Sequence, residues 1–392
     1  MPPRMRRVGL VVLVLGALLL TLIWLAAPYA RAAGLLARVA NAGGRLGAMA
    51  DARAYAVTKE SRTSVPTRVG DVAIQVYRPA GGTGRSILLI PGIHSMGIEE
   101  PRLKGLADDL AATGYTIVTS ALPDLQGYTI TQRSADVIED LVAALSARQD
   151  LTRDGRIGVA GISFAGGLSL AAAGRPRIRD HVAFVLSFGG HGDLPRVMHY
   201  LATGEETAVP GVAIHPPHDY GVAVILYALA GRGVVPADQV ETLRDGVRTF
   251  LFASQLTLVS REQADATFKK AREMADAMPE PARTYMSYVN DRAVTKLGPV
   301  LVPFLNQLGV DDPALSPQRA TPPVAPVFLL HGDEDTVIPP AESVLLGETL
   351  RTRGAHVRVL LSHLITHAEL DRTGDFAEAW RLIAFWADLL SR

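Results

Sequence analysis

Ser163 lies in a short segment, rich in small residues, that could present a nucleophile. The segment GISFAGG, residues 161–167, follows the apolar run RIGVA and precedes an alanine-rich stretch. A buried strand that turns sharply into a helix at a serine forms a nucleophile elbow, in which the hydroxyl projects at the carboxyl edge of a sheet. Because such a turn is strained, its neighbours must be small, as Gly161 and residues 165–167 are. We interpret Ser163 as a nucleophile; the alternative is a bystander serine in a glycine-rich turn.

Around Ser163 the chain resembles the α/β-hydrolase superfamily, and the resemblance covers most of residues 66–392. The family motif is G-x-S-x-G, and here Ala165 stands in the place of the last glycine. Alanine is small enough for that position. The resemblance implies a Ser-His-Asp triad whose members follow in the chain order nucleophile, acid, base.

The acid and the base that the resemblance implies lie near the C-terminus. The segment HGDED is similar to the family's H-G-x-x-D and puts the acid at Asp335, with Asp333 as the competitor. The family places its base in the loop after the last strand, where SHLITH offers His363 and His367. His363 abuts the strand too closely to swing toward the serine, so we favour His367. In this arrangement Asp335 would orient the imidazole that takes the proton of Ser163.

The resemblance also implies an oxyanion hole made of two backbone N–H groups. One donor comes just after the nucleophile and the other from the loop after an early central strand. Phe164 supplies the first by its position. The second falls in IPGIHSMG, where Pro91-Gly92 replaces the family's frequent His-Gly and points to Ile93, with His94 as the neighbouring option.

The elements that must position these residues alternate along the chain. Short apolar runs alternate with amphipathic stretches of helical length, which is typical of a mostly parallel sheet covered by helices on both faces. The predicted fold class is therefore α/β, of the α/β-hydrolase type. The predicted strands cover residues 72–77, 86–90, 115–120, 156–160, 182–188, 326–331 and 357–361.

The alternation stops between residues 195 and 320, where helical patterns are frequent and no strand pattern is convincing. We expect a helical cap inserted into the sheet domain. Residues 28–65, rich in Ala, Gly and Arg, are interpreted as a juxtamembrane helix and linker. The α/β-hydrolase core is expected to comprise residues 66–194 and 321–392.

The N-terminal segment 1–27 has the pattern of a membrane anchor. Residues 8–27 form an uncharged apolar run, about as long as a helix needs to cross a bilayer core of roughly 30 Å. Arginines at positions 4, 6 and 7 precede it and predict that the rest of the chain is exported. The alternative is a signal peptide cleaved near Arg31. Either interpretation places the catalytic body outside the cytoplasm.

Composition and motifs exclude several classes of function. With 48% hydrophobic and 20% charged residues the chain is of globular type, and 39 basic residues balance 39 acidic ones, which argues against a nucleic-acid partner. The absence of cysteine removes thiolate catalysis and Cys-ligated zinc. No glycine-rich phosphate motif follows a predicted strand, so no cofactor is indicated. Neither His191 with Asp193 nor the pair His215 and His218 with Asp219 has the spacing of a metal site.

These patterns together predict a serine hydrolase that cleaves an ester or related acyl bond through an acyl-enzyme. An apolar cap beside a membrane favours a small-molecule substrate of lipophilic character. An acyltransferase or a peptidase would use the same triad. A membrane-tethered binding protein that keeps the fold without catalysis is the alternative from another class.

Overall fold

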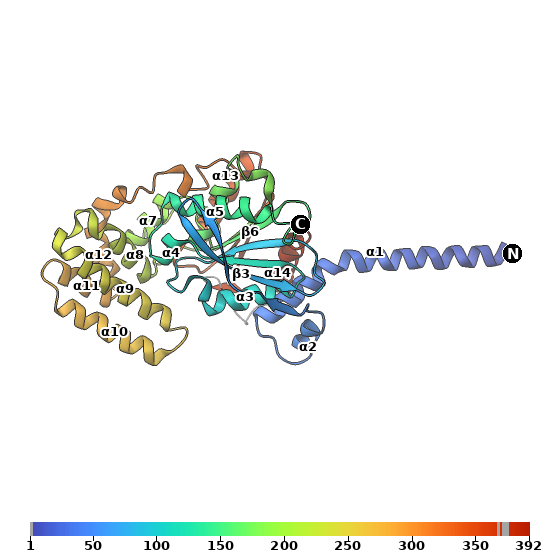
Figure 1. The fold of residues 1–392 in the computed structure, drawn as a ribbon, viewed down its shortest axis with the longest axis horizontal. Helices are drawn as coiled ribbons and strands as arrows, with labels where there is room; N and C mark the ends of the chain where they lie inside the picture. The colour runs from blue at the N-terminus through green and yellow to red at the C-terminus, as the bar shows by residue number, and fades with distance from the viewer. Residues whose placement is uncertain (1–2, 367–368, 371–375) are drawn as a thin grey trace.

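A nine-stranded sheet forms the centre of the protein (Figure 1). The structure is a computed structural model, and it describes residues 3–366, 369–370 and 376–392. The strand order is β1-β3-β5-β4-β6-β7-β8-β9, with β2 paired to β3. The strands of this sheet are β1 (Val57–Lys59), β2 (Thr63–Thr67), β3 (Gly70–Pro79), β4 (Ser86–Ile90), β5 (Thr116–Ser120), β6 (Ile157–Ile162), β7 (Val182–Phe188), β8 (Val327–Gly332) and β9 (Val357–Ser362).

All the strand pairs from β5 to β9 are parallel, whereas β1, β2 and β5 pair antiparallel with β3. Each predicted strand lies in this sheet, which confirms the expected α/β fold class. The sheet begins earlier than residue 66, because β1 and most of β2 precede that position. Outside this sheet, β10 (Ile365–Thr366) pairs antiparallel with β11 (Glu369–Leu370).

Helices cover both faces of the sheet because successive residues of a strand point to opposite sides. In β4, Leu88 belongs to one buried cluster, whereas Ile87 and Leu89 belong to the other. The first cluster includes residues of α5, α6 and α13, and the second includes residues of α1, α3 and α14. The helices outside the β7–β8 connection are α1 (Pro3–Val39), α2 (Gly44–Ala52), α3 (Pro101–Ala111), α4 (Pro123–Gln126), α5 (Gln132–Ser146), α6 (Phe164–Ala173), α13 (Ala341–Thr352) and α14 (Phe376–Leu389).

The connection between β7 and β8 is a helical layer at one end of the sheet, coloured from green to orange in Figure 1. We call this layer the cap. Its side chains continue the buried cluster of the sheet face that carries α5 and α6. Its helices are α7 (Leu194–Thr203), α8 (Asp219–Leu229), α9 (Val240–Leu256), α10 (Arg261–Asp276), α11 (Ala282–Asn290) and α12 (Val294–Leu301).

The long N-terminal helix α1 docks on the sheet domain only by its C-terminal part, and its N-terminal part projects away from the body (Figure 1). The docked part packs against α14 and α3. Ala32 and Leu35 are buried there, and Tyr29 stacks on Trp380 with ring centroids 5.6 Å apart. Residues 28–39, expected to lie in a juxtamembrane segment, thus contribute to the core.

Within the part of the chain that the structure describes, no helix is both long and apolar enough to cross a membrane. The anchor expected from residues 8–27, which lie within α1, is therefore not supported.

The docking of α1 predicts a contrast between two leucines of the same helix. Leu35 is 1% exposed, so Leu35→Ala leaves a cavity and should lower the free energy of unfolding by about 2 to 5 kcal/mol. Leu25 is 53% exposed, and Leu25→Ala should change it by less than about 0.5 kcal/mol. Urea unfolding of the full chain measures both values. Equal effects of the two substitutions would contradict the docking of α1.

Candidate active site

Ser163 occupies a strained turn between the end of β6 and the first residue of α6. Its backbone angles are φ 55° and ψ −133°, a region that non-glycine residues rarely adopt. The Ser163 N–H donates to Phe188 O at 2.7 Å, and the Gly166 N–H donates to Ser163 O at 2.8 Å. The turn is thus held from the neighbouring strand β7 and from its own helix. The sharp turn from strand to helix at Ser163 agrees with the predicted local structure, and the role of Ser163 as a nucleophile stays a prediction.

The glycines around the serine are required by close packing. A Cβ placed at Gly161 would lie 2.3 Å from Ala165 O, which is far inside van der Waals contact. A Cβ at Gly167 would lie 2.4 Å from the ring of His191, a fully buried side chain whose Nε2–H donates to Leu315 O at 2.7 Å. Small residues therefore let α6 approach both β6 and the segment after β7.

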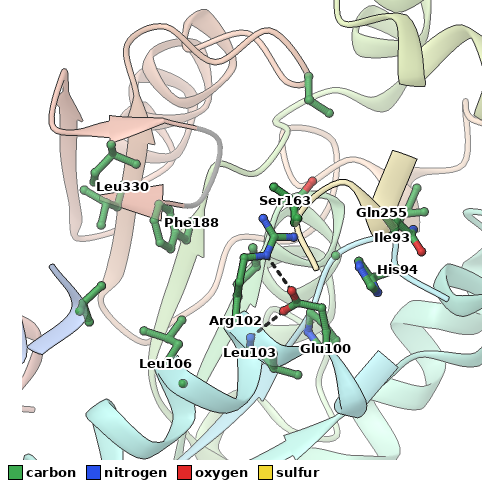
Figure 2. Close-up of a pocket in the computed structure, with 18 of the residues that line it drawn as sticks. Ile93, His94, Glu100, Arg102, Leu103, Leu106, Ser163, Phe188, Gln255 and Leu330 are labelled. Atoms are coloured by element: carbon green, nitrogen blue, oxygen red, sulfur yellow. Dashed lines mark hydrogen bonds and ion pairs between the residues drawn. The ribbon is translucent and has the colours of Figure 1, made fainter. Parts of the chain in front are cut away.

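The loop after β4 approaches the serine from the other side (Figure 2). A Cβ at Gly92 would lie 2.9 Å from Ser163 Cβ and 3.4 Å from its Oγ. Ile93, the expected second oxyanion donor, follows directly and lines the same cavity as Ser163. Phe164 is the first residue of α6, where backbone N–H groups have no intrahelical acceptor and the helix dipole is positive. The two expected donors therefore belong to segments that meet at Ser163.

Asp335 is buried in the turn after β8, with 1% of its surface exposed. Its Oδ1 accepts the N–H groups of Val337 and Ile338 at 2.8 and 3.1 Å. Its Oδ2 faces the end of β7, since a Cβ at Gly189 would lie 3.3 Å from it. A carboxylate held in this way is fixed in orientation. The next residues along the chain, Thr336 and Val337, line the cavity of Ser163.

His331 braces the turn that carries Asp335. Its ring is fully buried, with Nδ1 2.7 Å from Ser343 Oγ and Nε2 2.9 Å from Ile338 O. Nε2 also lies 3.4 Å from Asp335 Oδ2. The competing acid, Asp333, lies on the β9 side of the same turn, where its N–H donates to Ser362 O at 3.3 Å.

Of the two candidate bases, His367 lies outside the described residues. His363 is described: it is exposed just after β9 and does not line the cavity. The structure therefore brings Ser163, Ile93 and Phe164 together around one cavity and places Asp335 beside it.

The cavity has a volume of about 860 Å³ and extends from the cap past Ser163 to the docked end of α1. In Figure 2, Ser163 lies between Gln255 on one side and Leu106, Phe188 and Leu330 on the other. The contribution of α1 was not foreseen from the sequence, because no local pattern indicates where a terminal helix docks.

The cap is tied to both loops that flank Ser163. Gln255 of α9 accepts a hydrogen bond from Ser95 Oγ at 2.7 Å in the loop after β4, and its Nε2 lies 3.1 Å from Tyr220 OH. On the other side, the His218 N–H donates to Thr336 O at 2.8 Å. The cap thus closes over the site through contacts with the expected oxyanion loop and with the turn that carries Asp335.

A charged group beside the serine was missed by the sequence analysis. Glu100 accepts from Arg102 Nε at 2.6 Å and caps α3 by accepting the Leu103 N–H at 2.6 Å (Figure 2). Next to it, burial lowers the pKa of His94 to about 4, with Arg102 acting in the same direction and Glu100 opposing it. An acidic residue directly before Pro101, a proline typical of a first helical position, indicated that Glu100 caps the N-terminus of α3. It did not indicate that Glu100 lies beside Ser163.

Within residues 3–366, 369–370 and 376–392, no group of three or more His, Asp or Glu side chains could hold a metal ion. Asp193, considered with His191, instead caps α7 by accepting the Arg196 N–H at 3.1 Å. His218 lies with its Nδ1 2.9 Å from Asp219 Oδ1, and Asp219 is also paired with Arg292.

No protein-family model matches the chain, and no curated protein matches it either. Solved structures that it resembles include a hyperthermophilic esterase from the archaeon Pyrobaculum calidifontis, at 15% identity over 92% of this chain and 90% of that chain, with a TM-score of 0.46. The carboxylesterase EstE1 from a metagenomic library has 13% identity over 86% and 90%, with a TM-score of 0.45. An acylaminoacyl peptidase from Pyrococcus horikoshii has 14% identity over 89% of this chain but 44% of its own, with a TM-score of 0.47. At these identities the likeness does not bear on activity.

The strain at Ser163 predicts that glycine stabilises this position. Glycine adopts a positive φ freely, and the Ser163 side chain makes no capping hydrogen bond, so Ser163→Gly should raise the free energy of unfolding by about 1 kcal/mol. Ser169→Gly, in the middle of the same helix, should lower it by about 1 kcal/mol. Denaturant unfolding measures both, and a decrease in both variants would show that the turn is not strained.

The low pKa of His94 predicts a pH-dependent stability. The unfolded chain protonates this histidine near its ordinary pKa of 6.5, whereas the folded protein does so only near pH 4. Between these values the unfolded state binds more protons, so the free energy of unfolding falls as the pH falls. His94→Gln should make this fall shallower, as measured by urea unfolding across that range. An unchanged slope would contradict the lowered pKa.

Proposed function

We propose that the protein is a serine hydrolase that cleaves an ester or related acyl bond, with Ser163 as nucleophile. The observation that carries the proposal is the strained turn, in which a serine rather than glycine holds a positive φ at the edge of a cavity. Such strain costs about 1 to 3 kcal/mol and is found where function requires it. The position at the N-terminus of α6 adds a favourable dipole for negative charge developing beside the serine.

Asp335 is the proposed acid and His367 the proposed base. Asp335 is favoured over Asp333 because its carboxylate is buried, oriented by two backbone N–H groups, and turned toward the end of β7. A buried, fixed carboxylate is suited to hold an imidazole in one tautomer and to stabilise its protonated form. His367 follows β9 in the chain, and the choice of His367 over His363 is supported by the exposed position of His363 away from the cavity.

In the proposed reaction, Ser163 Oγ attacks the acyl carbonyl and its proton passes to His367. The N–H groups of Ile93 and Phe164 stabilise the oxyanion of the tetrahedral intermediate. The carbon–oxygen bond to the alcohol breaks, and the alcohol leaves with the proton from His367. Water then attacks the acyl-enzyme with His367 as base, which releases the carboxylic acid and regenerates Ser163. The apolar side chains in the cavity favour a lipophilic small molecule, and no cofactor takes part.

A fluorophosphonate probe tests the nucleophile and the triad on the full chain. The wild type should be labelled, and Ser163→Ala should not be labelled because the attacking oxygen is gone. Ser169→Ala removes a buried serine of the same helix outside the cavity and should leave labelling intact. Asp335→Asn should slow labelling by roughly 10³ to 10⁴, because the imidazole loses its orientation.

The paired variants decide between the residues that compete for each role. His367→Ala should abolish fast labelling and His363→Ala should not, and Asp333→Asn should react far faster than Asp335→Asn. Circular dichroism verifies that each variant is folded. If the folded wild type resists the probe, or Ser163→Ala is still labelled, the serine-hydrolase proposal fails.

A further inference from the structure

The cavity that contains Ser163 has two ends of different chemistry. The end under the cap is lined mainly by polar side chains, namely His218, Tyr220, Ser254, Gln255, Thr257 and Arg292. The opposite end, which we call the helix arm, lies between α1, α3 and α14 and is lined mainly by aliphatic and aromatic side chains. These are Leu35, Leu36, Val39, Leu103, Leu106, Leu382 and Trp386.

The charged groups near the helix arm form two ion pairs, Arg38 with Asp109 and Arg102 with Glu100. Arg38 of α1 donates to Asp109 of α3 through Nε at 3.1 Å and through Nη2 to the Asp109 carbonyl at 2.5 Å. Arg102 donates to Glu100 at 2.6 Å. The Arg38 to Asp109 pair also fastens α1 to α3 at the edge of the arm. Most of the other side chains that line the arm offer hydrocarbon surface.

We propose that the helix arm binds an extended aliphatic chain of the ester substrate, and that the docked end of α1 is part of the substrate-binding site. The arm is continuous with the space at Ser163, so a chain attached to the reacting ester can enter it without leaving the cavity. Each methylene group buried there should strengthen binding by roughly fourfold. The polar part of the substrate then lies at the cap end. This inference rests on the proposed function, which it extends to long-chain esters.

The aliphatic chain can belong to the acyl group or to the alcohol, and two ester series distinguish these sources. One series is p-nitrophenyl butyrate, octanoate, dodecanoate and palmitate; the other is the acetates of butanol, octanol and dodecanol. In one of the two series kcat/KM should rise with chain length up to at least dodecyl. Flat or falling values in both series would overturn the proposal.

Substitutions that fill the arm locate the chain. Val39→Trp on α1 and Leu106→Trp on α3 place a large ring in the arm from two sides. Each should lower the ratio of kcat/KM for the dodecyl to the butyl substrate by about tenfold or more, since a lost methylene contact changes selectivity by that order. Leu46→Trp, at an exposed position of α2 outside the cavity, is the matched control and should leave the ratio unchanged.

Leu258→Trp tests the opposite assignment, because Leu258 lines the cap end of the same cavity. If this variant lowers the ratio and the two arm variants do not, the chain lies under the cap and the proposal is wrong. Circular dichroism and urea unfolding verify that all four variants keep the fold.

A binding measurement separates this inference from the proposed function. Calorimetric titration of Ser163→Ala with sodium dodecanoate should show binding that Val39→Trp, added to the same variant, weakens by about tenfold. If no ester is hydrolysed but dodecanoate binds in this way, the proposed function fails and the arm assignment stands. If esters are hydrolysed but neither the ratio nor dodecanoate binding responds to Val39→Trp and Leu106→Trp, the arm assignment fails and the proposed function stands.

Discussion

The backbone conformation of Ser163 is the constraint on which the rest of the site depends. A serine at φ 55° persists only when its surroundings fix it. Here β7 accepts its N–H, α6 packs against β6 without space for a side chain at Gly161, and the loop after β4 comes so close that a Cβ at Gly92 would lie 2.9 Å from Ser163 Cβ. The same close approaches that stabilise the turn bring the loop after β4 and the first amide of α6 to one point. The contacts that hold Ser163 in its strained conformation are therefore the same contacts that bring the two proposed oxyanion donors together.

The walls of the cavity come from segments far apart in the chain, and each is fastened by its own contacts. Gln255 joins the cap to the loop after β4, and the His218 backbone joins it to the turn of Asp335. At the other end, the Arg38 to Asp109 pair and the buried Leu35 hold α1 on α3 and the sheet domain. The site therefore needs the whole chain from α1 to α14 to be folded. A form of the protein that lacks α1 would lose one wall of the cavity.

The sheet and the turn at Ser163 could be predicted because their causes are local. Buried strands appear as short apolar runs, and a strained turn requires small neighbours, both of which can be seen in the order of residues. The docking of α1 could not be predicted in this way. The residues that dock, such as Ala32 and Leu35, lie after the apolar run 8–27 in an alanine- and arginine-rich segment, and only the contacts between α1, α3 and α14 show that they belong to the core. The pair of Glu100 and Arg102 was missed for the same reason, since its place beside Ser163 depends on how α3 follows the loop after β4.

The combination of features at the site favours a catalyst over a binding protein with the same fold. A binding protein needs a cavity of suitable shape, which unstrained residues can line. It has no use for a serine at a positive φ, or for a carboxylate that is buried and oriented by the Val337 and Ile338 N–H groups. Burying such a carboxylate has a large desolvation cost unless hydrogen bonds offset it. Two costly features at the same edge of the sheet, after β6 and after β8, are accounted for together by the proposed nucleophile and the proposed acid that supports its base.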